Sequence, residues 1–141
     1  MNRYTSFFVK HKTTPPELDD HKGNVDKLDT NKQGVERGPE SDTYWLRTAP
    51  WGFRKLLNWI WNRYGAPIYI TENGTTAKGE TKPSAEVLDD KFRIEFFEGY
   101  LAAIGAAVDE DGVDIRSYFA WTFTDNWGKF KNAPLLYFSL F

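Results

Sequence analysis

The sequence predicts an α/β protein whose parallel sheet is incomplete within this chain. Strand-like and helix-like segments alternate along its 141 residues, and two stretches have helical spacing over lengths suited to crossover helices. Such alternation is typical of parallel sheets, which need helices on both faces or closure into a barrel. Because only three strand-like segments occur, the chain supplies only part of that sheet.

The chain begins with a short strand-like segment, residues 1–9, which ends in Phe7, Phe8 and Val9. Residues 10–43 are rich in Lys, Asp, Gly, Pro and Thr. This is the composition of a long, partly disordered polar loop. We do not expect it to link two complete domains, because nine residues precede it in this sequence.

Residues 50–64 are predicted to form an amphipathic helix. Pro50 suits the first turn, where a backbone N–H would have no helical partner. Apolar side chains then recur at helical spacing, namely Phe53, Leu56, Leu57, Ile60 and Tyr64. Gly65 and Pro67 end the pattern.

A short buried strand is expected at residues 67–71, and a loop rich in Gly, Thr and Lys at residues 73–86. Between them, Glu72 places a carboxylate at the end of the strand, where barrel enzymes carry their catalytic groups. Asn73 and Gly74 also form an ordinary turn dipeptide. The pattern alone therefore leaves Glu72 as either a catalytic carboxylate or a solvated residue beside a turn.

A second helix is expected over residues 89–109, with Asp89 or Asp90 as its N-cap. Its predicted buried side carries Phe92, Phe96, Phe97, Tyr100, Leu101, Ile104 and Val108. Gly112 ends this helix, and residues 113–123 have the Val, Ile, Tyr and Phe content of a further strand.

The composition argues against several classes of partner. A net charge of −2 gives no electrostatic footprint for nucleic acid or anionic lipid. The chain has no Cys, and its two histidines, His11 and His21, lie in a polar stretch without metal-binding spacing, so they are expected at the surface. No signal core and no apolar run near the ~20 residues of a membrane span occur. We expect a soluble chain without a metal.

Aromatic residues are abundant, with 11 Phe, 7 Tyr and 6 Trp. An excess of aromatic side chains often marks surfaces that stack on sugars or bases. The alternative is a large core of which this chain holds one part. The composition leaves both interpretations open.

Several segments together resemble the C-terminal third of family 1 glycoside hydrolases of the β-glucosidase type. The matching segments are residues 1–6 (MNRYTS), 69–74 (YITENG), 90–93 (DKFR), 110–116 (EDGVDIR), 118–121 (YFAW) and 125–126 (DN). They occur in the family's order over residues 1–127. The resemblance implies an incomplete (β/α)8 TIM barrel, roughly strands 6 to 8 with two long helices.

The resemblance also implies roles for four side chains. A retaining glycosidase needs a nucleophilic carboxylate and a second carboxyl about 5 to 5.5 Å away. Glu72 matches the nucleophile, and Tyr4 matches the tyrosine that contacts it. Asn2 would bind sugar or carboxylate, and Trp121 would stack beneath the glucosyl ring. The substrate would be a β-glucoside or another small glycoside, and no cofactor is implied.

For three of these residues the sequence also permits structural roles. Tyr4 could be a core tyrosine with a satisfied hydroxyl, and Asn2 an amide that closes a strand end. Trp121 could be an ordinary core residue at the end of a strand. The resemblance favours the functional role of Tyr4 and Trp121.

The sequence departs from the family pattern in one catalytic segment. The family's acid/base glutamate lies in a Thr-x-Asn-Glu-Pro segment after the fourth strand, and no such segment occurs here. Strands one to five are absent as well. We therefore expect the chain by itself to be inactive.

The end of the chain departs too, because Gly128 and Lys129 stand where the family has Glu-Trp. Residues 128–141 show no resemblance to the family's ending, and we expect an unrelated tail. Gly-Lys-Phe can be encoded by GGTAAGTTC, which contains a splice-donor consensus, so the hypothesis is a translated intron. Met1 similarly matches an internal Met of the family.

Two other functional hypotheses remain. The chain could be a non-catalytic carbohydrate-binding or interaction protein, or a non-functional truncated product. Oligomeric state stays open. Cellular location stays open too, because a targeting segment of a parent enzyme would precede Met1, and the cytoplasm is favoured for this chain.

Overall fold

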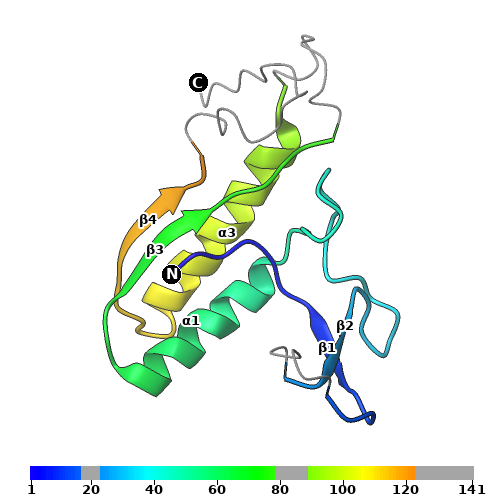
Figure 1. Cartoon of the computed structure of the whole chain (residues 1–141). Coiled ribbons are helices and arrows are strands. Elements are labelled where there is room, and N and C mark those ends of the chain that lie inside the picture. Colours follow the sequence, from blue (N-terminus) through cyan, green and yellow to red (C-terminus); the bar gives the residue numbers. More distant parts are fainter. Residues whose placement is uncertain (17–22, 79–88, 123–141) are drawn as a thin grey trace, which may run out of the picture.

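The computed structural model describes residues 1–16, 23–78 and 89–122 (Figure 1). Six elements lie within these ranges, and they alternate between strand and helix from α1 onward. In chain order they are β1 (Phe8–His11), β2 (Val25–Leu28), α1 (Pro50–Tyr64), β3 (Ile68–Asn73), α3 (Lys91–Asp109) and β4 (Ile115–Ala120). The α/β class predicted from the sequence is confirmed.

β3 and β4 pair in parallel, with Ile68 opposite Ile115 and Asn73 opposite Ala120. The first residues of the chain run parallel to β3 along its other edge (Figure 1). There the Met1 amino group donates to Tyr69 O at 2.5 Å, and Arg3 N donates to Glu72 O at 2.8 Å. The chain thus holds three adjacent parallel segments.

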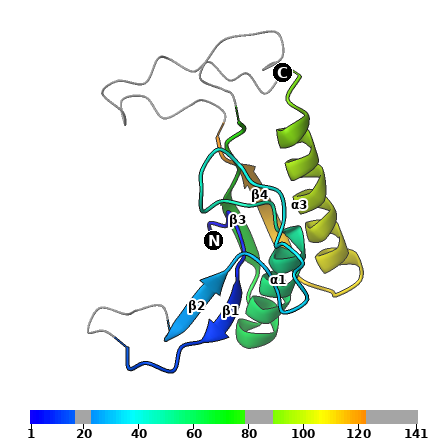
Figure 2. The same cartoon turned by 90° about the vertical axis from the view of Figure 1, so that its right-hand side faces the viewer.

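Both helices lie on the same face of this sheet (Figure 2). The core between the helices and the sheet is built from side chains of α1, α3, β3 and the segments beside them. It contains Leu46, Phe53, Leu57, Ile68, Ile70, Phe96, Tyr100, Ala107 and Val113. Among the described residues, no helix has both the length and the apolar character needed to cross a membrane.

The bounds of α1 agree with the prediction for residues 50–64. Pro50 occupies its first turn, and Gly65 ends it in the left-handed conformation at φ +60°, with its N–H donating to Trp61 O. Phe53 and Leu57 are fully buried, but Tyr64 at the end of the predicted apolar face is 64% exposed.

α3 is capped by Asp90, whose side chain accepts from Arg93 N at 3.2 Å, so one of the two predicted caps is correct. The predicted buried side was wrong for Leu101 and Val108, which are 48% and 41% exposed. Each lies one position after a buried residue, Tyr100 and Ala107. One step turns an α-helix by about 100°, which takes both side chains off the buried stripe.

The first strand lies later than predicted, because β1 spans Phe8–His11 rather than the end of residues 1–9. It pairs antiparallel with β2, from Phe8 opposite Leu28 to His11 opposite Val25. The prediction of an irregular polar loop over residues 10–43 was therefore wrong at β2. This strand has four residues, and three of them are exposed, so backbone pairing rather than apolar alternation defines it.

A buried arginine holds part of this polar region against the start of the chain. Arg37 is 1% exposed, and its guanidinium donates to Asp29 Oδ1 at 2.6 Å, Thr5 Oγ1 at 2.6 Å and Trp45 O at 2.9 Å. Its cationic group also lies 4.1 Å from the centre of the Phe7 ring. Residues 29–45 are thus fixed against the segment that follows Tyr4.

Candidate active site

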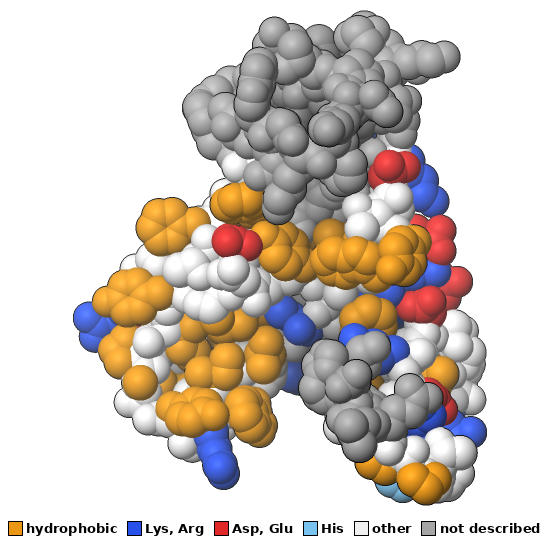
Figure 3. Space-filling view, in the orientation of Figure 1, with side chains coloured by type: hydrophobic (Ala, Val, Ile, Leu, Met, Phe, Trp, Pro, Cys, Tyr) orange, Lys and Arg blue, Asp and Glu red, His pale blue; other side chains and the backbone are white. Residues whose placement is uncertain are grey.

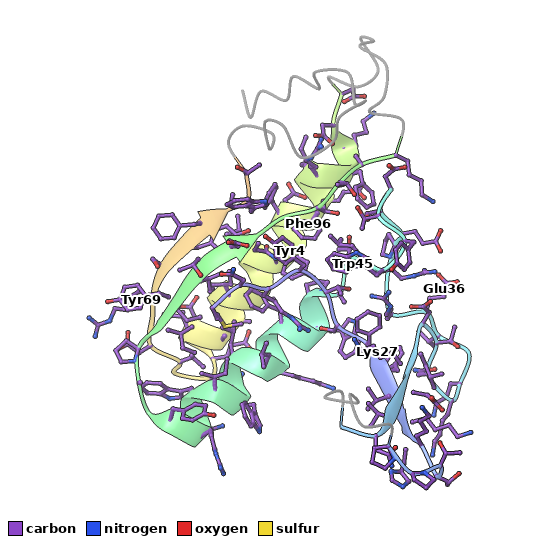
Figure 4. All side chains as sticks on the ribbon, in the orientation of Figure 1. Tyr4, Lys27, Glu36, Trp45, Tyr69 and Phe96 are labelled. Atoms are coloured by element: carbon purple, nitrogen blue, oxygen red, sulfur yellow. The ribbon has the colours of Figure 1, made fainter. Side chains whose placement is uncertain are left out.

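The structure brings Tyr4 and Glu72 together at the carboxyl end of β3. The Tyr4 hydroxyl donates to Glu72 Oε2 at 2.5 Å, although 68 positions separate the two residues. Parallel pairing of residues 1–3 with β3 creates this contact, because it places both strand ends at the same edge. Tyr4 in turn meets the ring of Trp45 edge-on, with 6.5 Å between ring centres (Figure 4).

The surroundings of Tyr4 keep its phenol protonated. Burial raises its pKa, and the hydrogen bond to the Glu72 carboxylate and the negative charge of that group raise it further. A protonated phenol is a permanent donor at neutral pH. Tyr4 can therefore orient one carboxylate oxygen of Glu72 and leave the other for chemistry.

Asn2 lies beside Thr71 at the same edge. Its Oδ1 accepts a hydrogen bond from Thr71 Oγ1 at 2.5 Å, and its backbone forms a parallel bridge with Glu72. This contact fits the structural role of an amide that closes a strand end. The side chain is also exposed, which leaves it accessible to a ligand.

Trp121 directly follows β4, and its backbone N–H donates to Asn73 O at 2.8 Å. Its side chain is 41% exposed and does not belong to the core cluster. The segment after β3 approaches it closely, because a Cβ on Gly74 would lie 1.8 Å from Trp121 O. Glycine at position 74 permits this approach.

Two residues of this region were not singled out in the sequence. Asn73 is completely buried, its Nδ2 donates to Arg3 O at 2.7 Å, and its Oδ1 accepts from the Tyr118 hydroxyl at 2.8 Å. In the sequence the Asn-Gly pair indicated a turn, and it gave no sign that the Asn73 amide is buried and hydrogen-bonded. Tyr118 belonged to the YFAW segment of the resemblance, and its period-two spacing with Ala120 was the available indication of its face.

The face of the sheet opposite the helices carries exposed apolar side chains. Figure 3 views this face, and hydrophobic groups gather over the sheet and beside it. Tyr69 is 53% exposed and Phe119 58%. Tyr69 is paired with Ser117, which lies two positions before Phe119 in β4. Because side chains alternate along a strand, Tyr69 and Phe119 point to the same face.

The described residues hold no cluster of three or more His, Cys, Asp or Glu side chains that could bind a metal ion. The side chains described above offer this site a carboxylate, a phenol, an amide and an indole. The matching segment at residues 125–126 and the predicted tail, residues 128–141, lie outside the described residues.

Comparison with known proteins connects this geometry to one family. The sequence profile described as Glycosyl hydrolase family 1 matches residues 1–134. Beta-glucosidase 4 of Oryza sativa subsp. japonica is 40% identical over 129 residues, which cover 89% of this chain and 26% of that protein. Beta-glucosidase 1B of Phanerodontia chrysosporium is 41% identical over 127 residues, which cover 89% of this chain and 23% of that protein.

Solved structures give the same result. A GH1 beta-glucosidase from the fungus Humicola insolens, in complex with glucose, superposes with a TM-score of 0.86 at 49% identity over 91% of this chain and 27% of that one. Beta-glucosidase 2 from the fungus Trichoderma reesei, in complex with Tris, superposes with a TM-score of 0.88 at 45% identity over 99% of this chain and 30% of that one. The chain spans less than a third of the length of these relatives.

Proposed function

The chain belongs to glycosyl hydrolase family 1, and from this premise we propose that it carries the nucleophile side of a retaining β-glucosidase-type active site. Glu72 is the nucleophile in this proposal. Its carboxylate attacks the anomeric carbon of a terminal β-linked glucoside as the bond from that carbon to the aglycone oxygen breaks. The product is a glycosyl ester of Glu72, which water then hydrolyses.

The hydrogen bond from Tyr4 to Glu72 is the observation that carries this proposal. A nucleophilic carboxylate must be correctly oriented, and the phenol at 2.5 Å holds one oxygen of Glu72 in place. In the proposed complex Trp121 stacks on the glucosyl ring and Asn2 binds a sugar hydroxyl. No metal or cofactor takes part in this chemistry.

The proposed reaction also needs a proton donor for the departing oxygen. A Thr-x-Asn-Glu-Pro segment does not occur in this sequence, so the acid/base carboxyl has to come from elsewhere. We therefore propose that these 141 residues are inactive alone and act only with the preceding part of a family 1 barrel.

Activity with a complementing polypeptide tests this function. The chain is mixed with the part of the Humicola insolens enzyme that precedes the matched region, and hydrolysis of an aryl β-glucoside is followed. We expect turnover only from the mixture, and a loss of on the order of 10³-fold or more with Glu72→Gln. Glu98→Gln on α3 is the control and is expected to retain activity.

An activated 2-deoxy-2-fluoro-β-glucoside identifies the nucleophile independently of steady-state rates. It should form a slowly hydrolysed ester, and peptide mass spectrometry should find the label on Glu72. Label on a different residue, or full activity of Glu72→Gln in the mixture, would contradict the assignment. Turnover by the chain alone would contradict its dependence on a second polypeptide.

The exposed aromatic side chains favour one alternative, a non-catalytic carbohydrate-binding protein. Tyr69, Phe119 and Trp121 are accessible in the isolated chain, and aromatic planes bind the apolar faces of sugars. This function predicts quenching of tryptophan fluorescence by cellobiose, its loss in Trp121→Ala, and no turnover in the mixture. A non-functional product would show neither binding nor cooperative unfolding.

A further inference from the structure

Three strand ends meet at the side chain of Asn73. Residues 1–3 lie along one edge of β3 and β4 lies along the other, so Asn73 at the end of β3 sits between them. Its amide is completely buried and uses both of its polar atoms. Nδ2 donates to Arg3 O at 2.7 Å, and Oδ1 accepts from the Tyr118 hydroxyl at 2.8 Å.

The hydrogen bond to Arg3 acts on the residue directly before Tyr4. Arg3 is fixed to β3 at both of its backbone polar groups, because its N–H donates to Glu72 O at 2.8 Å and its C=O accepts from Asn73. Fixing both groups leaves the peptide plane between Arg3 and Tyr4 little freedom to rotate. The backbone position from which the Tyr4 side chain extends is therefore fixed relative to Glu72.

The bond from Tyr118 determines how the amide is oriented. A buried carboxamide can turn over by 180° unless its donor and acceptor ends meet different partners. Here the phenol occupies the oxygen and the Arg3 carbonyl occupies the nitrogen, which defines a single orientation. The Asn73 backbone adds a third link, since its O accepts from Trp121 N at 2.8 Å.

We propose that Asn73, held by Tyr118, is a positioning residue that keeps the Tyr4 hydroxyl at hydrogen-bonding distance from Glu72. Asn73 does not touch the reacting atoms in this proposal. It acts through Arg3 and through its own position next to Glu72 in the chain. The importance of this arrangement for catalysis rests on the proposed function, whereas the positioning itself concerns only the folded chain.

The Tyr4 phenol reports directly on this positioning. Its pKa is raised by burial and by Glu72, so weakening the contact should return the pKa toward the ordinary tyrosine value of about 10. The full chain is labelled with ¹³Cζ-tyrosine, and the Tyr4 resonance is assigned by its absence in Tyr4→Phe. The titration of Tyr4 is then compared between wild type and variants.

Two variants and one control make the comparison specific. Asn73→Ala removes both hydrogen bonds of the amide, and Tyr118→Phe removes one of them while it keeps the ring. We expect the Tyr4 titration to move to lower pH in both, and further in Asn73→Ala. Asn58→Ala removes an amide of α1 that donates to Arg54 O and Asp111 Oδ2, and it should leave the Tyr4 titration unchanged.

A folded Asn73→Ala variant with the wild-type Tyr4 titration would overturn the proposal. If Asn73→Ala does not fold, Tyr118→Phe provides the test, because an unchanged Tyr4 titration in that variant would equally overturn the proposal. An equal shift in Asn58→Ala would show a general loosening and would also overturn it. These measurements need no substrate, so they stand whether or not the mixture hydrolyses a glucoside.

Discussion

At the scale of single residues, the bond between Tyr4 and Glu72 predicts a specific dependence of stability on alkaline pH. Because the pKa of Tyr4 is raised in the folded chain, the unfolded chain releases this proton more readily. The stabilisation from the phenol is therefore complete below about pH 10 and is lost as the pH rises through the folded-state pKa. Tyr4→Phe lacks this dependence.

Urea unfolding of wild type and Tyr4→Phe at pH 8 and pH 11 measures this difference. At pH 8 we expect wild type to be more stable, since a hydrogen bond to a charged group contributes about 1.5 to 3 kcal/mol before screening by solvent, which reduces it at this half-buried site. At pH 11 the advantage of wild type should be smaller. An advantage that stays constant or grows with pH would contradict this assignment.

Gly74 gives a second prediction at this scale, and it concerns close packing. A Cβ at this position would lie 1.8 Å from the backbone oxygen of Trp121, and a backbone atom cannot turn aside as a side chain can. Gly74→Ala should therefore destabilise the fold by more than about 2 kcal/mol. Denaturant midpoints of the two proteins provide the measurement.

Gly105 is the matched control for this prediction. It lies inside α3, and a Cβ there would meet nothing within 4 Å. Gly105→Ala should stabilise the helix by about 0.5 to 1 kcal/mol. If Gly74→Ala were as stable as wild type, the close approach between residue 74 and Trp121 would not exist in solution.

At the scale of elements, the end of α3 is tied to α1 by a carboxylate. Both Nε and Nη2 of Arg54 donate to Asp111 at 2.7 Å, and Asn58 Nδ2 donates to it at 2.6 Å. The hydrogen bonds from Arg54 and then Asn58 lower the pKa of Asp111 from 3.8 to about 2. The stabilisation from this contact is therefore present above about pH 4 and is lost as the pH falls toward 2.

Asp111→Asn tests this contact between the two helices. At pH 7 the variant should be less stable than wild type, and its stability should fall less between pH 4 and pH 2. Thermal melting at several pH values in this range gives the comparison. An equal loss of stability in both proteins between pH 4 and pH 2 would show that Asp111 does not link α1 and α3 in the way described.

The helices and the parallel strands could be predicted from the sequence, because the residues that indicate each element lie within it or directly beside it in the chain. Pro50 and Gly65 mark both ends of α1, and apolar spacing fills the interval between them. β2 could not be predicted, because only its pairing with β1 makes it a strand. The burial of Arg37 was equally hidden, since its partners Thr5 and Trp45 come from distant segments.

At the scale of the whole molecule, the candidate site is predictable only in part. Glu72 was singled out from its place at a strand end and from resemblance, and its contact with Tyr4 agrees with the same resemblance. The buried bridge from Asn73 to Arg3 and Tyr118 depends on the order of three strands in space. Neighbouring residues along the chain carry no sign of that order.

The sheet has apolar groups on its open face, which predicts self-association of the isolated chain. Among the described residues, β4 pairs only with β3, and residues 1–3 pair only with β3. Within this described part of the chain, both outer edges offer backbone hydrogen-bonding groups, and Tyr69 and Phe119 add exposed apolar surface beside them. Unpaired edges next to apolar side chains are sites where strands of other chains add.

Sedimentation velocity over a range of concentrations should show this association. Phe119→Lys and Tyr69→Lys place a charge on the open face and should shift the population toward monomer, whereas Leu101→Lys on α3 should not. The complementing part of the Humicola insolens enzyme should compete with self-association, because a barrel that closes uses the same edges and face. A chain that stays monomeric at every concentration would contradict the predicted self-association. Equal association of all three variants would show that the open face of the sheet is not the surface involved.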